Sequence, residues 1–211
     1  MDVQTIIKEL KDLYPNADCT LNWSNPLELL VATILSAQCT DKRVNIVTKD
    51  LFIKYKSAGD FVSISIEELE NDIRSCGTFR MKAVSIQESC RIIINKFNGE
   101  VPKTMEDMVK LKGVGRKTAA VVLSTAFGIM EGIAIDTHNI RLLRRLGLTD
   151  EEDQKKIEQD MMRKTPKKDW AKLSHLLIAH GRSICSAQSP ACNKCIFVDR
   201  CPSFSVRERK E

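Results

Sequence analysis

The chain has 211 residues, of which 43% are hydrophobic, so it can bury a sizeable core and is not predicted to be disordered. Its 33 Lys and Arg against 28 Asp and Glu give a net charge of +5, whose sign favours a polyanionic partner over an acidic one. No stretch is long and apolar enough to span a bilayer, and residues 1–14 have the pattern of an amphipathic helix rather than an export signal.

The predicted elements are almost all helices. After the first helix, Asn25 is the predicted N-cap of a buried helix, with Pro26 in its first turn and Glu28 closing a capping box. Asp41 and Ser65 are the predicted caps of the next two helices. The later helices are predicted over 82–97, 104–111, 116–128, 136–146, 151–164 and 169–182. No strand alternation joins two β-rich runs, so the predicted fold class is all-α.

A short run with two glycines around one apolar residue, Gly113-Val114-Gly115, separates two predicted helices. Such a turn exposes backbone N–H groups beside a helix N-terminus, where they can bind a phosphate without reading sequence. Three cations add positive charge at the same end: Lys112, Arg116 and Lys117. A lone Gly-x-Gly is also compatible with an ordinary connection between helices carrying solvated lysines.

Lys117 and Asp136, which follow this turn in the sequence, are candidates for a chemical role. Lys117 is predicted in the first turn of a helix, where a cation is disfavoured, and exceptions to local rules often mark function. Asp136 is predicted as the N-cap of the next helix, which would hold its carboxylate in place. His138, in the same turn, is interpreted as a packing or capping partner.

Eight cysteines without an export signal indicate reduced thiols or metal ligation rather than disulfides. Four of them are interpreted as small core residues: Cys19, Cys39, Cys76 and Cys90. The other four have gaps of six, two and five residues between them: Cys185, Cys192, Cys195 and Cys201. This set predicts a metal centre, and its chemistry alone leaves a zinc site and an iron–sulfur cluster open.

Three independent segments resemble the endonuclease III family. The cysteine spacing, which follows His180-Gly181-Arg182, is similar to the family's 4Fe–4S loop. The run 111–119 is similar to its helix–hairpin–helix signature, and the similarity continues to residue 128. The segment 35–41 is similar to one whose glutamine fills the gap left by a flipped nucleotide.

The resemblance implies a helix–hairpin–helix DNA glycosylase fold with two helical lobes. A six-helix lobe would span 20–130 and contain the helix–hairpin–helix at about 104–128. Residues 1–19 plus 131–211 would form the second lobe, with a C-terminal 4Fe–4S cluster loop at 185–201. The DNA-binding groove is expected between the lobes.

The resemblance also implies base excision repair by a bifunctional glycosylase and abasic-site lyase. Lys117 and Asp136 would face each other and act as the catalytic residues, removing oxidised pyrimidines such as thymine glycol from duplex DNA through a Schiff base, followed by β-elimination. The 4Fe–4S cofactor would be structural. DNA contacts are expected at Gln38, Thr78, Lys112, Gly113, Val114, Gly115, Arg116 and Thr118. We expect a monomer that acts in the cytoplasm, at the nucleoid if the source is prokaryotic.

Three departures from the family pattern stand beside the resemblance. Lys112 occupies a position that is usually proline, the connection over 128–136 is about one residue longer, and Thr78 stands where a bulky aliphatic wedge is common. Two alternative functions are a hydrolytic glycosylase of the same fold, against which Lys117 argues, and a non-catalytic DNA-binding module stabilised by zinc.

Overall fold

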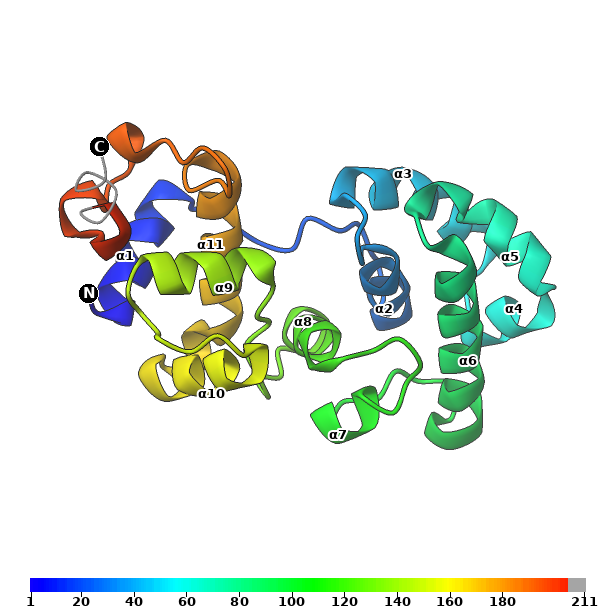
Figure 1. Cartoon of the computed structure of the whole chain (residues 1–211). Helices are drawn as coiled ribbons and strands as arrows, with labels where there is room; N and C mark the ends of the chain where they lie inside the picture. The colour runs from blue at the N-terminus through cyan, green and yellow to red at the C-terminus, as the bar shows by residue number, and fades with distance from the viewer. Residues whose placement is uncertain (205–211) are drawn as a thin grey trace. The chain divides into compact units, whose positions relative to one another are not determined.

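The computed structural model describes residues 1–204, which contain eleven α-helices and four short 3-10 helices and no strand (Figure 1). The all-α prediction is therefore confirmed for this part of the chain. No helix within it is long and apolar enough to cross a membrane. The chain forms two compact units, residues 20–131 and residues 1–19 with 132–211. We call the first the hairpin unit and the second the cysteine unit.

The hairpin unit contains seven α-helices where six were expected. They are α2 (Pro26–Leu35), α3 (Asp41–Lys54), α4 (Ala58–Ser63), α5 (Ile66–Asp72), α6 (Phe79–Phe97), α7 (Met105–Met108) and α8 (Arg116–Phe127), with the 3-10 turn η1 (Arg74–Cys76) before α6. The sequence analysis missed α4 because six residues are too short for a helical stripe. Its start is set instead by a capping box between Ser57 and Asp60.

Helix α2 lies at the centre of the hairpin unit and packs against α8, α6 and α3. Eight of its ten residues are buried, since it is apolar on nearly every side. Asn25 caps it as predicted by accepting a hydrogen bond from the Glu28 backbone N at 3.0 Å. The predicted capping box is wrong in one respect, because the buried Glu28 carboxylate accepts from the N and Oγ of Ser24, each at 2.7 Å.

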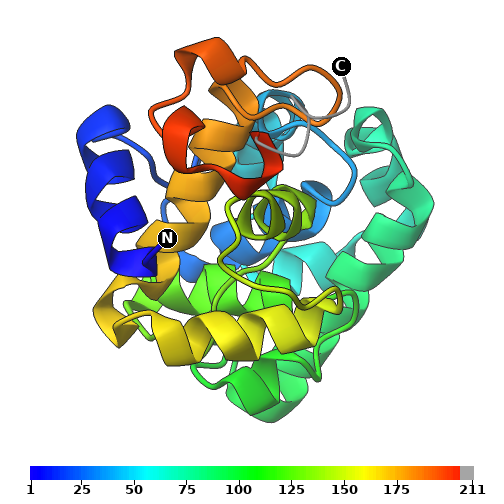
Figure 2. The same cartoon turned by 60° about the vertical axis from the view of Figure 1, so that its left-hand side comes forward.

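The cysteine unit is built around α11 (Trp170–Ser183), which packs against α9 (Thr137–Arg145) and α1 (Val3–Leu13). Figure 2 shows α1 running beside α11 although the two are far apart in sequence. The remaining elements are α10 (Gln154–Lys164), η2 (Lys167–Asp169), η3 (Cys192–Lys194) and η4 (Val198–Arg200). Two ion pairs join α1 to other elements of this unit: Lys11 pairs with Asp169 of η2 at 2.7 Å, and Glu9 pairs with Arg200 of η4 at 2.6 Å.

Helix boundaries differ from the predictions where a capping side chain decides them. Thr40, not Asp41, is the N-cap of α3 and accepts from the Arg43 backbone N at 3.3 Å. Asp41 is the first helical residue and accepts a hydrogen bond from Thr20 Oγ1 at 2.6 Å. Helix α10 starts three residues later than expected because Asp153 caps it. Helix α6 starts three residues earlier, at Phe79.

The four cysteines interpreted as core residues divide into two pairs. Cys76 and Cys90 are buried, as expected. Cys19 and Cys39 are partly exposed, so the expectation was wrong for them. Both lie in loops between helices, where the backbone does not bury the side chain.

Candidate functional site

The predicted hairpin turn is anchored by α6. Gly113 has a φ of +74°, in the region that favours glycine, and a Cβ there would lie 2.7 Å from Ser85 Oγ. One helical turn further along, Ser89 Oγ donates a 2.8 Å hydrogen bond to the carbonyl of Lys112. The turn therefore requires glycine at this position for both conformation and space, and two serines of α6 hold it. Sequence analysis missed these serines because small polar residues in a helix carry no distinctive signal.

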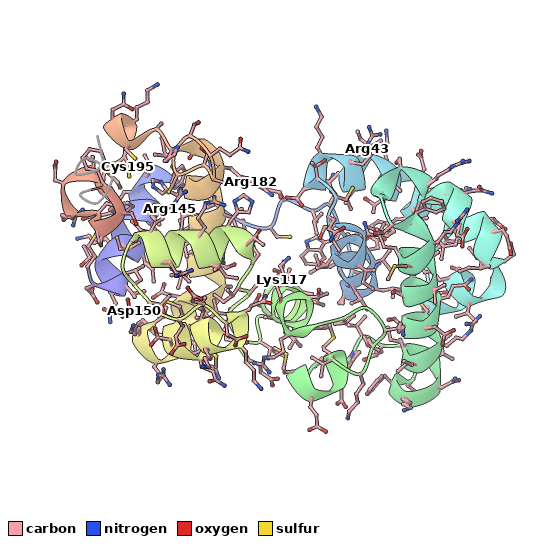
Figure 3. The ribbon with its side chains drawn as sticks, viewed as in Figure 1. Arg43, Lys117, Arg145, Asp150, Arg182 and Cys195 are labelled. Carbon is pink, nitrogen blue, oxygen red and sulfur yellow. The ribbon has the colours of Figure 1, made fainter. Side chains whose placement is uncertain are left out.

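Lys117 lies in the first turn of α8, directly after the hairpin, and its side chain is half-buried (Figure 3). Gly115 is the N-cap of this helix and provides no capping side chain. The N-terminal N–H groups of α8 therefore keep their capacity to bind an anion. Leu111 and Val114 are 3% and 5% exposed and fix the hairpin to the core. Val114, one of the expected DNA contacts, thus turns its side chain inward.

The other expected DNA contacts on the hairpin lie together at the start of α8. The exposed ones are Lys112, Gly113, Gly115 and Arg116, and Thr118 is half-buried. Two cations and two glycines are thus gathered around one helix N-terminus, an arrangement that suits the phosphate backbone of a nucleic acid.

Gln38 and Thr78 lie in two loops of the hairpin unit that touch each other. A Cβ on Gly77 would lie 3.8 Å from the carbonyl oxygen of Gln38. Both residues are exposed and adopt left-handed backbone conformations, with φ of +53° for Gln38 and +45° for Thr78. In residues 1–204 only one other non-glycine residue, Asn98, does so. Such conformations cost free energy and concentrate at functional sites, which supports a binding role for these loops.

A buried lysine that the sequence analysis missed joins these two loops. Lys82 is only 4% exposed, and its Nζ donates to the carbonyl of Leu35 at 2.8 Å and to that of Cys76. Leu35 ends α2, three residues before Gln38, and Cys76 precedes Thr78 by two. Burial lowers the pKa of Lys82, while the neighbouring Cys39 and Cys76 act in the opposite direction. Its position in an apolar helical stripe gave no sign of this role.

Asp136 in the cysteine unit caps α9, as predicted. Its Oδ1 accepts from the Asn139 backbone N at 2.8 Å, which leaves Oδ2 for a second partner. The Asn139 side chain donates to the carbonyl of Ala134 at 2.9 Å and to Ser174 Oγ at 2.8 Å. Since Asn139 is fully buried, this network fixes the backbone on both sides of the Asp136 carboxylate.

His138 has a structural role within the same helix, as interpreted from the sequence. Its Nδ1 lies 3.3 Å from Nη2 of Arg141, one turn along α9. The close packing of α9 against α11 leaves little room here, because a Cβ on Gly181 would lie 3.2 Å from the same Nδ1.

The four C-terminal cysteines line one cavity of the cysteine unit, together with Arg145, His180 and several apolar residues. In residues 1–204, no three His, Cys, Asp or Glu side chains are gathered closely enough to hold a single metal ion. Burial raises the pKa of the Cys195 thiol, and the charges of the other three cysteines raise it further. Ionisation of all four thiols in this position would be costly unless a positively charged group neutralised them.

Two further side chains contact these sulfur atoms. Nη1 of Arg145 donates to Cys185 Sγ at 3.4 Å, and Cys201 Sγ donates to the Arg145 carbonyl at 3.4 Å. His180 Nε2 lies 3.5 Å from Cys195 Sγ. Burial lowers the pKa of His180 to about 4, so at neutral pH its ring carries no charge. His180 belongs to the segment that carries the family resemblance, whereas nothing in the sequence indicated Arg145.

Comparison with known proteins gives matches over nearly the whole chain. A family model described as HhH-GPD superfamily base excision DNA repair protein matches residues 31–167. The chain is 50% identical to endonuclease III of Synechocystis sp., over 94% of this chain and 90% of that one. It is 46% identical to endonuclease III of Bacillus subtilis, over 99% and 95%. A solved trapped endonuclease III–DNA covalent intermediate matches with a TM-score of 0.93 at 45% identity, over 99% of this chain and 100% of that one.

Proposed function

Because this chain belongs to the endonuclease III family of helix–hairpin–helix base excision DNA repair proteins, we propose that Lys117 and Asp136 excise oxidised pyrimidines of the thymine glycol type from its DNA. As a member of the family it is a DNA glycosylase and abasic-site lyase that acts on double-stranded DNA. The observation that carries the residue assignment is the half-buried Lys117 at the N-terminus of α8, directly after a hairpin held by α6.

The reaction begins when the damaged nucleotide leaves the base stack. The Lys117 amine attacks C1′ of the sugar, the glycosidic bond breaks, and the base departs with the bonding electrons. Loss of a proton from the amine and opening of the sugar ring give a Schiff base between Nζ and C1′. A proton then leaves C2′, and its electrons expel the 3′ phosphate, which cuts the strand. A solved relative was trapped as a covalent intermediate with DNA, which supports this class of chemistry.

Asp136 supports the displacement through its charge. Because Oδ1 is committed to the Asn139 backbone N, the carboxylate cannot rotate freely, and Oδ2 can interact with the sugar or with a proton in transit. The buried Asn139 network keeps this carboxylate in one orientation at no cost during the reaction.

The expected DNA contacts divide into two classes by chemistry. The hairpin and the start of α8 bind backbone phosphates through N–H groups and cations, which positions the duplex without reading its sequence. Gln38 and Thr78 contact the bases around the lesion, where Gln38 fills the gap left by the extruded nucleotide. The small Thr78 side chain contributes less wedging than an aliphatic residue would.

The four C-terminal cysteines fit a 4Fe–4S cluster better than a single zinc ion, since they line one cavity without converging on one point. Cys185, Cys192, Cys195 and Cys201 would hold it. When bound, it supplies the structural support that shapes the basic loop over 185–201 for contact with the DNA backbone. Arg145 and His180 contact the sulfur atoms and orient this loop.

We assign the hairpin to a lobe of residues 20–130 and the cluster to a lobe of residues 1–19 with 131–211. Each lobe contributes one of the two proposed catalytic residues. The protein is proposed to act as a monomer in the cytoplasm, at the nucleoid if its source is prokaryotic, where duplex DNA is available.

Borohydride trapping on a duplex containing thymine glycol tests the proposed nucleophile. Borohydride reduces a Schiff base to a stable amine, so the native chain is expected to give a covalent protein–DNA band and Lys117→Ala none. Lys110→Ala is the matched control, because this neighbouring lysine is exposed and paired with Glu106 and Asp107. The control is expected to give a band of native intensity.

Two results would contradict the assignment. A band that persists in Lys117→Ala would place the nucleophile elsewhere. No band for the native chain on thymine glycol or on an abasic site, with DNA binding intact, would leave a hydrolytic glycosylase or a binding module, and release of free base would decide between those two.

A further inference from the structure

Cys39 and Cys76 form a thiol pair in the hairpin unit, at the contact between the Gln38 loop and the Thr78 loop. The loops that carry them are in contact: a Cβ on Gly77, next to Cys76, would lie 3.8 Å from the carbonyl oxygen of Gln38, next to Cys39, and the neighbouring Cys39 thiol raises the pKa of Cys76. Cys39 follows Gln38 directly, and Cys76 precedes Thr78 by two residues. The pair is therefore located where the two base-contacting loops meet.

The two thiols differ in their access to solvent. Cys76 is fully buried, and burial raises the pKa of its thiol to about 11, so it stays protonated. Cys39 is partly exposed and can meet a small reagent from solution. One accessible thiol beside one protected thiol is the arrangement in which the first is oxidised and the second resolves the product.

Two cations act on this pair. The Lys82 Nζ donates to the carbonyl of Cys76, and the positive charges of Lys82 and Arg43 lower the pKa of the Cys76 thiol. Positive charge nearby stabilises a sulfur that becomes negative as it reacts. The hydrogen bonds from Lys82 to the carbonyls of Leu35 and Cys76 also bridge the two loops.

We propose that Cys39 and Cys76 are a site of reversible oxidation by peroxides, and that the resulting disulfide holds the two base-contacting loops in a form that binds damaged DNA poorly. The Cys39 thiolate attacks the O–O bond of the peroxide, becoming a sulfenic acid as hydroxide or alkoxide leaves. The Cys76 sulfur then displaces water from that sulfenic acid and loses its proton. The two sulfurs each supply one electron, and the peroxide is reduced.

The effect on DNA follows from the backbone of the two loops and rests on the proposed function. Gln38 and Thr78 already hold strained left-handed conformations and must adjust when a nucleotide is extruded. A disulfide draws its sulfurs to about 2 Å and fixes the torsions around them. Because the crosslink joins residues beside both DNA contacts, neither loop can adjust independently of the other.

Peptide mapping of the intact, cluster-loaded protein tests the disulfide without reference to DNA. After mild peroxide treatment and alkylation, trypsin releases Cys76 in the peptide 75–80 and Cys39 in the peptide 12–42. A Cys19→Ser background removes the other thiol of the longer peptide. The expected product is a 75–80 peptide joined to 12–42, with a mass lower by two hydrogens and sensitive to dithiothreitol. Oxidation of Cys39 without this crosslink would overturn the proposal.

Binding to a duplex with a stable tetrahydrofuran abasic analogue tests the consequence. Oxidation is expected to weaken binding by about tenfold, with recovery on addition of dithiothreitol. Cys39→Ser, treated identically, is expected to keep its affinity, which separates this pair from damage to the cluster. Cys76→Ala is a second variant with the same expectation. A crosslinked protein that binds this duplex with unchanged affinity would overturn the proposed effect of the disulfide on DNA binding. Weak binding by the reduced protein would instead count against the proposed function.

Discussion

Asp136 shows how one residue combines a structural and a chemical role. As the N-cap of α9 it satisfies a backbone N–H that no residue within the helix can satisfy, and this bond holds the carboxylate in one orientation. Lys117 differs, because its position at a helix N-terminus opposes the helix dipole. Lys117 does not stabilise the helix at this position, so a role in the reaction explains its presence better than a structural role does.

Replacement of Asp136 by asparagine separates these two roles. Asparagine is as good a helix N-cap as aspartate, so the free energy of unfolding of Asp136→Asn is expected to lie within about 0.5 kcal/mol of the native value. Removal of the charge is expected to lower the rate of base release on the order of 100-fold or more. Thermal unfolding and single-turnover base release measure the two effects. A large loss of stability with an unchanged rate would show that Asp136 is only a cap.

At the scale of elements, α6 carries much of the organisation of the proposed DNA-binding surface. Its N-terminus bears Thr78, Lys82 in its first turns ties two loops together, and its Ser85 and Ser89 hold the hairpin. A single rigid helix therefore sets the spacing between the base-contacting loops and the phosphate-binding turn. The hairpin is thus positioned by its tertiary contacts with α6 as well as by its own sequence.

The two glycines of the hairpin are expected to respond differently to alanine. Gly113→Ala places a Cβ 2.7 Å from Ser85 Oγ at a φ of +74°, and is expected to lower the free energy of unfolding by about 2 kcal/mol and to weaken DNA binding. Gly115→Ala is the matched control for stability, since its backbone is extended and nothing lies within 4 Å. Urea unfolding of both variants checks this, and equal stabilities would contradict the anchoring role of α6.

Helix α10 contains an acid whose contribution depends on pH. Asp160 is buried, which opposes its ionisation, but hydrogen bonds from Lys164 and Thr149, each at 2.8 Å, outweigh this and lower its pKa below the ordinary 3.8. Because the folded-state pKa is the lower one, its stabilisation is present above about pH 4 and is lost as the pH falls through the lowered pKa. Asp160→Asn is therefore expected to be less stable by about 1–2 kcal/mol at pH 7.

Denaturant unfolding at several pH values checks this expectation. The difference in free energy of unfolding between Asp160→Asn and the native chain should become steadily smaller below pH 4. Asp150→Asn, at an exposed position of the preceding loop, serves as the comparison and should show little change at any pH. A difference for Asp160→Asn that does not vary with pH would show that hydrogen bonding, and not charge, is responsible.

For the whole molecule, the cysteine unit brings together helix α1 and the cysteine loop, which are far apart in the sequence. Helix α1 and the cysteine loop are joined by the Glu9–Arg200 ion pair, and Tyr14 Oη lies 3.1 Å from Nδ1 of His180, whose other nitrogen faces Cys195. The loop over 185–201 has little regular structure beyond two 3-10 turns. Its order therefore depends on these contacts and on the cluster that we propose its cysteines hold.

Loss of the cluster is expected to destabilise the cysteine unit selectively. Cys195→Ser removes a proposed ligand at the position that contacts His180 and is expected to reduce iron content and visible absorbance, with hydrogen exchange rising in 185–201 and α1. Exchange in α2 and α6 should change little. Metal analysis that finds stoichiometric zinc and no iron in the native protein would refute the 4Fe–4S assignment.

The sequence alone determined the helical class, the position of the hairpin, the cap at Asp136 and the grouping of four cysteines. Each of these depends on local patterns: apolar periodicity, paired glycines, a capping carboxylate and close spacing. Tertiary structure decided the role of Lys82, the anchoring of Gly113 by Ser85, the contacts of Arg145 and the contact between the Gln38 and Thr78 loops. These pairs are separated by up to 56 residues in the sequence, and no local pattern specifies which distant side chains meet when the helices pack.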